Sequence, residues 1–118
     1  MIDEILDEIS ACRKCSQLEP WKKFDSYAHG NKYSKFMLVS EAPGKRAIDK
    51  MKYWSGVSGN KIRNILRELT NHELDELFYF SDIVKCLPPK NRTPKANEIE
   101  ECKSYLRKEI DSLKPASI

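Results

Sequence analysis

Four cysteines are the residues of this chain whose type and spacing most clearly indicate chemistry. Cys12 and Cys15 form a CxxC pair, whereas Cys86 and Cys102 lie much further along the sequence. Two adjacent thiols and two distant ones can supply the four thiolates of one metal site, because folding brings ligands from several elements to one point. The site is either an iron–sulfur cluster, which the wide separation of the second pair favours, or a structural zinc. A disulfide pair or four unrelated thiols are the alternatives.

A second group of chemically suggestive residues follows two apolar segments. Glu41 comes directly after the apolar run at 36–39 and precedes a Pro-Gly turn. Trp54 begins a segment that runs through Gly59 into the start of a predicted helix. The free backbone N–H groups at such a helix start can receive a phosphate. Arg92 follows a Pro-Pro pair in a cationic turn. Together these residues predict a nucleotide site, although each one alone is equally well explained as a loop acid, a core aromatic or a solvated charge.

The elements that must position these residues alternate between helix and strand. Helical periodicity covers residues 3–11, 60–69 and a stretch beyond the turn at 91–94, while buried strands are predicted near 36–39 and 78–84. Strands separated by helices imply right-handed crossovers and a parallel sheet. Ligands of such sheets gather beyond the carboxyl ends of the strands. We therefore expect an α/β domain whose loops at 40–59 and 85–95 form the site.

Two of the predicted helices carry an apolar face. In the helix at 60–69 this face comprises Ile62, Ile65, Leu66 and Leu69. In the last helix it comprises Ile99, Cys102, Leu106, Ile110 and Leu113. An apolar stripe of this kind is typical of the buried side of a helix.

Composition indicates a single domain over residues 1–118 and a cytoplasmic protein. The acidic, amphipathic N-terminus is unlike a signal peptide, and no apolar run approaches the roughly 20 residues that span a bilayer, so we expect no membrane partner. Reduced cytoplasmic thiols favour metal ligation over disulfides. One third of the residues are charged, and the net charge of +3 permits contact with nucleic acid.

The motifs around these residues follow the pattern of a known family. Residues 40–44 read S-E-A-P-G against a family pattern G-E-[AG]-P-G. Residues 52–59 read K-Y-W-S-G-V-S-G where the family has G-R-P-F-V-G-x-[AS]-G. Residues 81–94 read S-D-I-V-K-C-L-P-P-K-N-R-T-P against T-N-x-V-K-C-x-P-P-x-N-R-x-P. With all four cysteines in register, the chain resembles the type 4, iron–sulfur uracil-DNA glycosylases over essentially its whole length.

This resemblance implies a uracil-DNA-glycosylase-like fold, a cofactor, a partner and a reaction. Cys12, Cys15, Cys86 and Cys102 would ligate a structural 4Fe–4S cluster, with zinc as the alternative metal. DNA would be the partner, and the reaction would be hydrolysis of the bond between uracil and deoxyribose in base-excision repair. The base must be flipped out, because its glycosidic carbon is inaccessible in a stacked duplex.

The resemblance also assigns roles to individual residues. Glu41 would be the catalytic acid of the water-activating loop. The residues expected to bind substrate are Ala42, Gly44, Trp54, Ser58, Gly59, Asp82 and Arg92. Of these, Trp54 would stack on the flipped base, Ser58 and Gly59 would bind a phosphate, and Asp82 would face the base. Lys85, Asn91 and Arg92 would lie near DNA or support the cluster loop.

Three of the positions that depart from the family pattern bear on the shape and chemistry of the site. Asp82 replaces an Asn that can donate to uracil O4 and accept from N3–H at once, whereas an ionised carboxylate only accepts. A protonated Asp82, or a base presenting an amino group, would restore the match. Ser40 replaces a Gly and Tyr53 replaces a Pro, so we expect the first loop to have a different shape.

The family pattern also continues beyond Ile118, with further strands and a His-Pro loop that stabilises charge on uracil. We therefore expect a partial domain that lacks the C-terminal strands and depends on a missing segment or a protein partner. Two hypotheses follow. The chain is a uracil-DNA glycosylase or its N-terminal part, with activity in doubt in this form, or it is a non-catalytic iron–sulfur module that binds DNA or a partner.

Overall fold

Two parallel strands form the centre of the computed structural model, which describes residues 1–13 and 22–118. Strand β1 (Met37–Ser40) pairs with β2 (Tyr79–Asp82), so that Ser40 lies opposite Asp82 at the carboxyl ends of both strands. The strands predicted near 36–39 and 78–84 are thereby confirmed with slightly different ends. The predicted α/β class and the parallel sheet are also confirmed.

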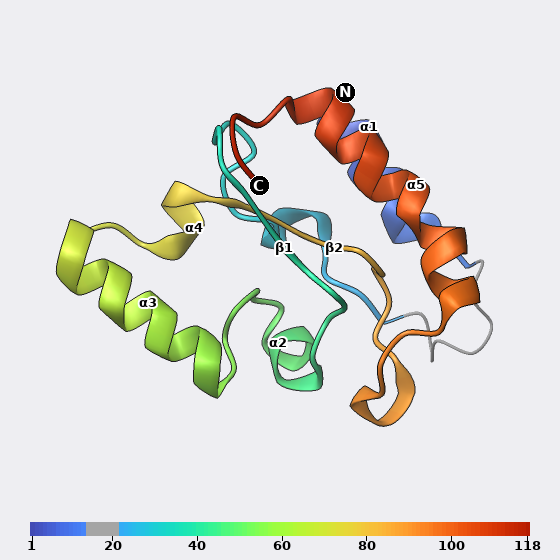
Figure 1. Ribbon diagram of the computed structural model, residues 1–118, viewed down its shortest axis with the longest axis horizontal. Helices are drawn as coiled ribbons and strands as arrows, with labels where there is room; N and C mark the ends of the chain where they lie inside the picture. Colours follow the sequence, from blue (N-terminus) through green and yellow to red (C-terminus); the bar gives the residue numbers. More distant parts are fainter. Residues whose placement is uncertain (14–21) are drawn as a thin grey trace.

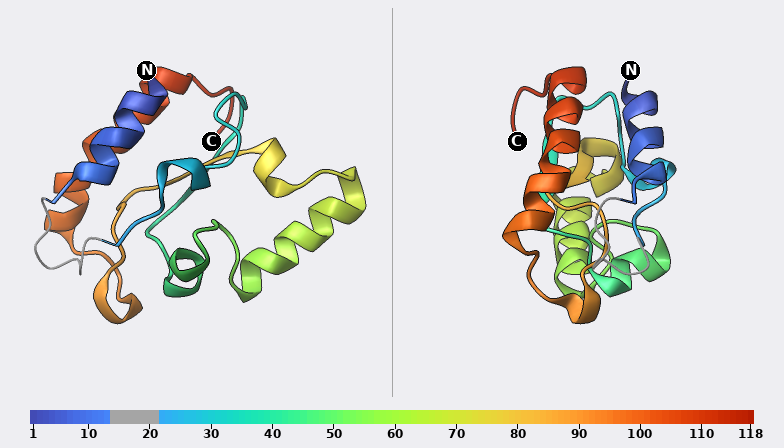
Figure 2. Two further views of the ribbon diagram at one scale, coloured as in Figure 1. Left: turned by 180° about the vertical axis from the view of Figure 1, so that it is seen from behind. Right: turned by 90° about the vertical axis from the view of Figure 1, so that its right-hand side faces the viewer.

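Helices lie at both ends of this sheet (Figure 1). The described helices are α1 (Ile2–Ala11), α2 (Lys45–Lys50), α3 (Val57–Thr70), α4 (Leu74–Leu77) and α5 (Ala96–Leu113), with short 3-10 turns at η1 (Ser26–Ala28) and η2 (Pro89–Asn91). Helices α1 and α5 pack side by side at one end of the molecule, and α3 lies at the other (Figures 1 and 2). The helices α2 and α4 were not predicted, because six and four residues are too few for a periodic signal. Among the described helices, none has the length and apolar character that crossing a bilayer requires.

The free edge of β1 is partly covered by residues near the C-terminus. The N–H of Met37 donates to the carbonyl of Ser117 at 3.0 Å, and the N–H of Ala116 donates to the carbonyl of Lys35 at 2.7 Å. Phe36 and Ser117 form a parallel bridge. This contact is an isolated bridge beside β1, and the described sheet has two strands.

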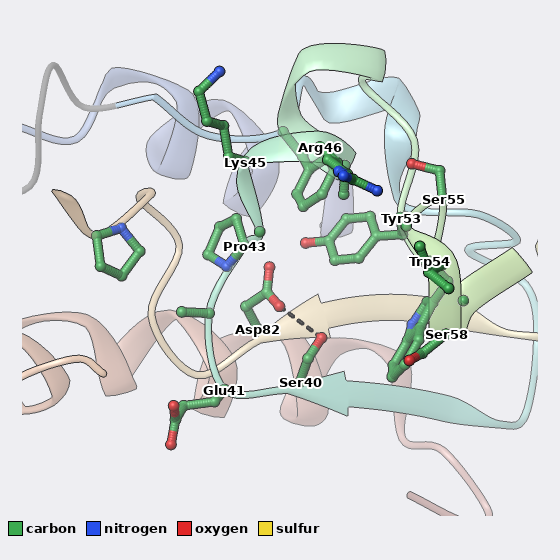
Figure 3. A pocket seen from close by; sticks show the side chains of 18 of the residues that line it. Ser40, Glu41, Pro43, Lys45, Arg46, Tyr53, Trp54, Ser55, Ser58 and Asp82 are labelled. Atoms are coloured by element: carbon green, nitrogen blue, oxygen red, sulfur yellow. Dashed lines mark hydrogen bonds between the residues drawn. The ribbon is translucent and has the colours of Figure 1, made fainter. Parts of the chain in front are cut away.

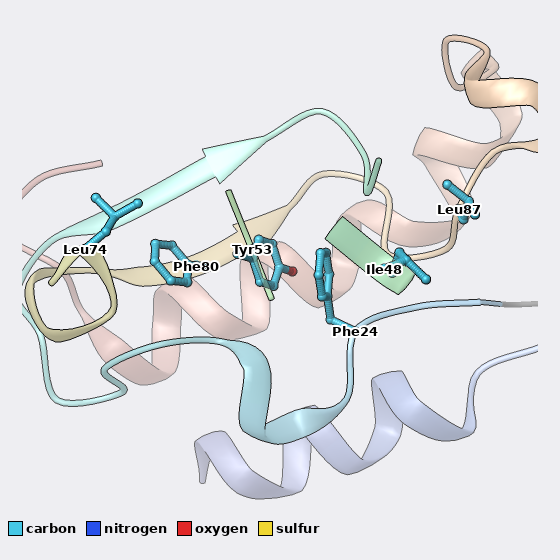
Figure 4. Packing of buried hydrophobic residues seen from close by; sticks show 6 residues of the cluster. All are labelled: Phe24, Ile48, Tyr53, Leu74, Phe80 and Leu87. Atoms are coloured by element: carbon cyan, nitrogen blue, oxygen red, sulfur yellow. The ribbon is translucent and has the colours of Figure 1, made fainter. Parts of the chain in front are cut away.

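The largest apolar cluster packs on one face of the sheet (Figure 4). Its buried members are Phe24, Ile48, Tyr53, Leu74, Phe80 and Leu87. The ring of Tyr53 is stacked on Phe24, with centroids 3.7 Å apart, and on Phe80, with centroids 5.4 Å apart. Burying such side chains stabilises a fold by about 1.5–3 kcal/mol each. The packing therefore holds the loop before α3 firmly against the sheet.

The apolar face predicted for α3 does not pack as expected. Ile65 and Leu69 are 54% and 76% exposed, and only Leu66 of that face contacts the core. The helix instead buries Gly59 and Arg63. This part of the prediction was wrong because the loop before the helix, rather than an apolar layer, covers its inner side.

The inner face of α5 is also more polar than predicted. Its buried residues are Glu98, Cys102, Tyr105 and Glu109, whereas Ile99, Leu106, Ile110 and Leu113 are only half-buried. The two glutamates are tolerated because each is paired with a cation, Glu98 with Arg92 and Glu109 with Lys85. Hydrophobic periodicity alone could not indicate these buried ion pairs.

Candidate functional site

A cavity of about 560 Å³ opens beyond the carboxyl ends of β1 and β2 (Figure 3). It is lined by the loop after β1, the loop before α3 and the segment that carries η2. All eight residues that the motifs predicted for catalysis or substrate binding line it: Glu41, Ala42, Gly44, Trp54, Ser58, Gly59, Asp82 and Arg92. The fold therefore brings together residues that are up to 51 positions apart in sequence (41 to 92). Their individual roles stay predictions.

Asp82 forms the polar floor of this cavity and is only 1% exposed. The hydroxyl of Ser40 donates to Asp82 Oδ1 at 2.7 Å, while Oδ2 is buried without a hydrogen-bond partner among the described residues. Burial raises the pKa of Asp82 to about 7, against the opposing effects of the Ser40 hydrogen bond and the charge of Lys85. The hydroxyl of Tyr53 faces this carboxyl and also lowers its pKa, but it does not complete a hydrogen bond to Oδ2 (Figure 3).

The loop that carries Trp54 is fixed by a buried guanidinium. Arg63 is 5% exposed and donates from Nε to the carbonyl of Trp54 at 2.8 Å and from Nη2 to that of Tyr53. Its Nη1 lies 2.8 Å from Asp75 Oδ1, an ion pair whose angle falls short of a hydrogen bond. Trp54 itself has a φ of 55°, which is unfavourable for a bulky side chain. The hydrogen bonds from Arg63 of α3 therefore hold Trp54, in a strained backbone conformation, at the cavity wall.

Gly59 is required by the close approach of this loop to α3. A Cβ at Gly59 would lie 2.3 Å from the carbonyl oxygen of Trp54. Helix α3 begins at Val57, and its N-cap Gly56 supplies no side-chain hydrogen bond. The first N–H groups of a 14-residue helix therefore face the cavity rim, where Ser58 is exposed.

Glu41 and Arg92 lie at the rim in different situations. Glu41 is exposed, and its carboxylate is turned away from Asp82 (Figure 3). Arg92 makes a two-pronged ion pair with Glu98 at 2.8 and 2.7 Å, so it ties the turn after η2 to the first turn of α5. The Glu98 carboxylate beside it raises the pKa of Arg92. Arg92 is therefore a permanent cation at the cavity, but one already engaged with a carboxylate.

Two cations of α2 complete the rim and were not singled out from the sequence. Lys45 and Arg46 are exposed and line the cavity (Figure 3). Lys45 pairs with Asp49 at 2.9 Å. Their position directly after the Pro-Gly turn could have indicated them in the sequence, because residues that follow a turn at the carboxyl end of a strand lie near the site. A basic rim attracts the phosphates of nucleic acid.

Three of the four cysteines belong to the described part of the chain, and Cys15 lies outside it. Cys12 and Cys102 share the apolar cluster between α1 and α5, and the N–H of Lys85 donates to Cys102 Sγ at 3.3 Å. The backbone of Cys86 forms an isolated antiparallel β-bridge with that of Lys23. The Nζ of Lys23 in turn donates to the carbonyl of Cys12 at 2.8 Å. Within residues 1–13 and 22–118, however, no three His, Cys, Asp or Glu side chains are placed to hold a metal ion.

Lys85 connects the cysteine region with the cavity floor. Its Nζ pairs with Glu109 in a buried contact and donates to the carbonyl of Asp82 at 2.6 Å. Glu109 also accepts from Ser81 Oγ at 2.7 Å and from the hydroxyl of Tyr79. The Lys85 side chain is only 3% exposed, and its role, near DNA or in support of the cluster loop, stays a prediction.

Comparison with known proteins gives consistent matches. A model of the Uracil DNA glycosylase superfamily matches residues 27–118. The chain is 33% identical over 114 residues to a type-4 uracil-DNA glycosylase of Saccharolobus solfataricus, covering 97% of this chain and 52% of the relative. A type-4 uracil-DNA glycosylase of Archaeoglobus fulgidus is 32% identical over 114 residues, covering 97% and 56%. The chain thus spans about half the length of these curated relatives.

A different kind of protein also contains a similar region. A DNA polymerase of Bacillus phage SP01 is 32% identical over 103 residues. The match covers 85% of this chain but only 11% of the polymerase. A domain similar to this chain therefore also occurs as a small part of a much larger protein.

Proposed function

This chain belongs to the uracil-DNA glycosylase superfamily, and on that premise we propose that its cavity binds a uracil flipped out of DNA for hydrolysis of the N-glycosidic bond. The observation that carries the proposal is the convergence of all eight motif residues on one cavity. The cavity has an aromatic wall, a polar floor and a cationic rim. These features suit a base, its hydrogen-bonding edge and its flanking phosphates, respectively.

The reaction would proceed without any covalent bond to the protein. A water oxygen attacks the sugar C1′, the bond from C1′ to N1 breaks, and uracil leaves with the bonding electron pair. Glu41, exposed at the rim beside the cavity, would orient this water and take up its proton, while its charge stabilises the electron-poor sugar. Trp54 at the cavity wall would stack on the base.

The phosphate groups next to the flipped nucleotide would bind around the start of α3. Ser58 is exposed there, and the helix N-terminus presents N–H groups without a side-chain cap. Lys45 and Arg46 on α2 would add long-range attraction to the DNA backbone. Their contribution should depend strongly on salt, because phosphate contacts displace counterions.

We propose that Cys12, Cys15, Cys86 and Cys102 hold an iron–sulfur cluster in a reducing cytoplasm. The donor set fits, since Cys12 and Cys102 are neighbours and the N–H of Lys85 already donates to Cys102 Sγ, as backbone amides do to metal-bound thiolates. The cluster would be structural, joining α1, α5 and the segment after β2. Zinc is the alternative, and strong visible absorbance would distinguish the iron–sulfur cluster because zinc is d¹⁰.

A non-catalytic role is the second candidate. The phage polymerase match favours it, because there a similar region makes up only 11% of a larger protein. In that role the chain would use the same cavity and cationic rim to hold DNA for a partner enzyme. Binding of uracil-containing DNA without base removal would be the expected behaviour.

Incubation with labelled oligonucleotides separates the two candidates. Single- and double-stranded substrates with one deoxyuridine are treated with the anaerobically purified chain and then with alkali, which cleaves at abasic sites. Cleavage that disappears with Glu41→Gln but persists with Tyr27→Phe, an exposed control outside the cavity, supports the glycosylase. Tight binding without cleavage supports the non-catalytic module. The absence of both binding and cleavage contradicts both candidates.

A further inference from the structure

Three departures from the family pattern meet in space although they are far apart in the sequence. Ser40 stands where the family has Gly, Tyr53 where it has Pro, and Asp82 where it has Asn. In the structure the Ser40 hydroxyl donates to Asp82 Oδ1, and the Tyr53 hydroxyl faces the same carboxyl (Figure 3). All three line the cavity. Substitutions that converge on one group indicate a changed but coordinated recognition element.

We infer that Tyr53 and Asp82 together read the hydrogen-bonding edge of uracil, with Asp82 Oδ2 accepting from N3–H and the Tyr53 hydroxyl donating to O4. The inference rests on the proposed uracil site. An Asn amide offers both an acceptor and a donor, whereas an ionised carboxylate offers acceptors alone. The Tyr53 hydroxyl would supply the donor that the change from Asn to Asp removes.

The unpartnered Asp82 oxygen is the first observation that carries this assignment. Asp82 Oδ2 is buried without a hydrogen-bond partner among the described residues, and the residue lines the cavity. A buried acceptor left unpaired costs free energy that a ligand N–H can recover. The bond from Ser40 engages Oδ1 and thereby selects Oδ2 as the atom offered to a ligand.

The placement of Tyr53 is the second observation. Its ring is 3% exposed and fixed by stacking on Phe24 and Phe80, so the hydroxyl has a defined direction. Burial and the nearby carboxylates of Asp82 and Glu109 raise the pKa of Tyr53 well above its usual range. The hydroxyl therefore keeps its proton and stays available as a donor. Preorganised groups bind more tightly because less freedom is lost on binding.

A double-mutant cycle tests the pairing. The ligands are single-stranded oligonucleotides with one 2′-fluoro-2′-deoxyuridine, whose glycosidic bond resists hydrolysis, or its N3-methyl derivative, and Kd is measured by fluorescence anisotropy. Tyr53→Phe keeps the ring and removes only the hydroxyl, so it should weaken binding to the uracil oligonucleotide about 5- to 10-fold. In an Asp82→Asn background, where the amide again supplies a donor, the same change should cost less than about twofold.

Each outcome of the cycle decides something specific. A Tyr53→Phe effect of equal size in both backgrounds would show that Tyr53 only packs, and this would overturn the pairing. An unchanged Kd for the N3-methyl derivative would show that Asp82 does not accept from N3–H and would overturn it as well. Both results leave the proposed uracil site in place, provided that the uracil oligonucleotide binds more tightly than an abasic one. Absence of that preference overturns the proposed function itself.

Discussion

Replacing Asp82 by Asn should stabilise the folded chain at alkaline pH and leave its stability almost unchanged at pH 4. Burial raises the pKa of this carboxyl from 3.8 to about 7. Between these values the unfolded chain releases a proton that the folded chain keeps. The folded state therefore binds more protons, and its stability falls as the pH rises from about 4 to about 7. Above that range the full penalty of a buried carboxylate is present.

The magnitude follows from the size of the shift. A change of about three pKa units, at about 1.36 kcal/mol each, corresponds to about 4 kcal/mol at pH 8. Asn keeps the acceptor for the Ser40 hydroxyl and removes the charge, so the variant should recover most of this penalty. Against a typical total stability of about 5–15 kcal/mol, an effect of this size is easily measured.

Urea denaturation followed by circular dichroism at pH 4, 6 and 8 provides the assay. The free energy of unfolding of the Asn variant should exceed that of the wild type by a margin that grows with pH. Asp111→Asn, a change at an exposed position on α5, is the control and should show no such trend. Parallel pH profiles for wild type and Asp82→Asn would refute the reasoning, because they would mean that the carboxyl ionises as freely in the folded chain as in the unfolded one.

Three further perturbations have defined outcomes. Lys85→Met should lower the free energy of unfolding by about 3–5 kcal/mol, because it leaves the charge of Glu109 buried and unpaired, and adding Glu109→Leu should restore much of the loss; additive losses in thermal unfolding would contradict the pairing. Gly59→Ala should displace the carbonyl of Trp54 and weaken binding of the uracil oligonucleotide. An unaltered Kd would show that the loop around Trp54 can move without affecting binding. Cys102→Ala should remove bound iron and visible absorbance, and a variant with full iron content would exclude this residue as a ligand.

The strands and the composition of the site could be predicted from the sequence because both depend on local signals. An apolar run followed by a Pro-Gly turn marks a strand end, and parallel strands place their carboxyl ends together. This signal singled out Glu41, which follows β1, whereas Asp82 at the end of β2 was assigned only through the family resemblance; both line the cavity.

The pairing of side chains across elements could not be predicted in the same way. Ser40 and Tyr53 were recognised only as unusual residues, because nothing in the sequence shows that both face the carboxyl of Asp82. The exposure of the apolar face of α3 was not predicted for a related reason. The helix turns Arg63 inward because two carbonyl groups of the preceding loop accept its hydrogen bonds, and hydrophobic periodicity does not indicate such bonds.

The most direct test of the central claim, that a flipped uracil enters this cavity, is the intrinsic fluorescence of the chain during titration with an oligonucleotide that carries one non-cleavable deoxyuridine. A base stacked on Trp54 should quench its emission, and the quenching should vanish in Trp54→Phe although that variant still binds the oligonucleotide. Equal quenching in both proteins, or no quenching in the wild type at saturation, would contradict the placement of the base.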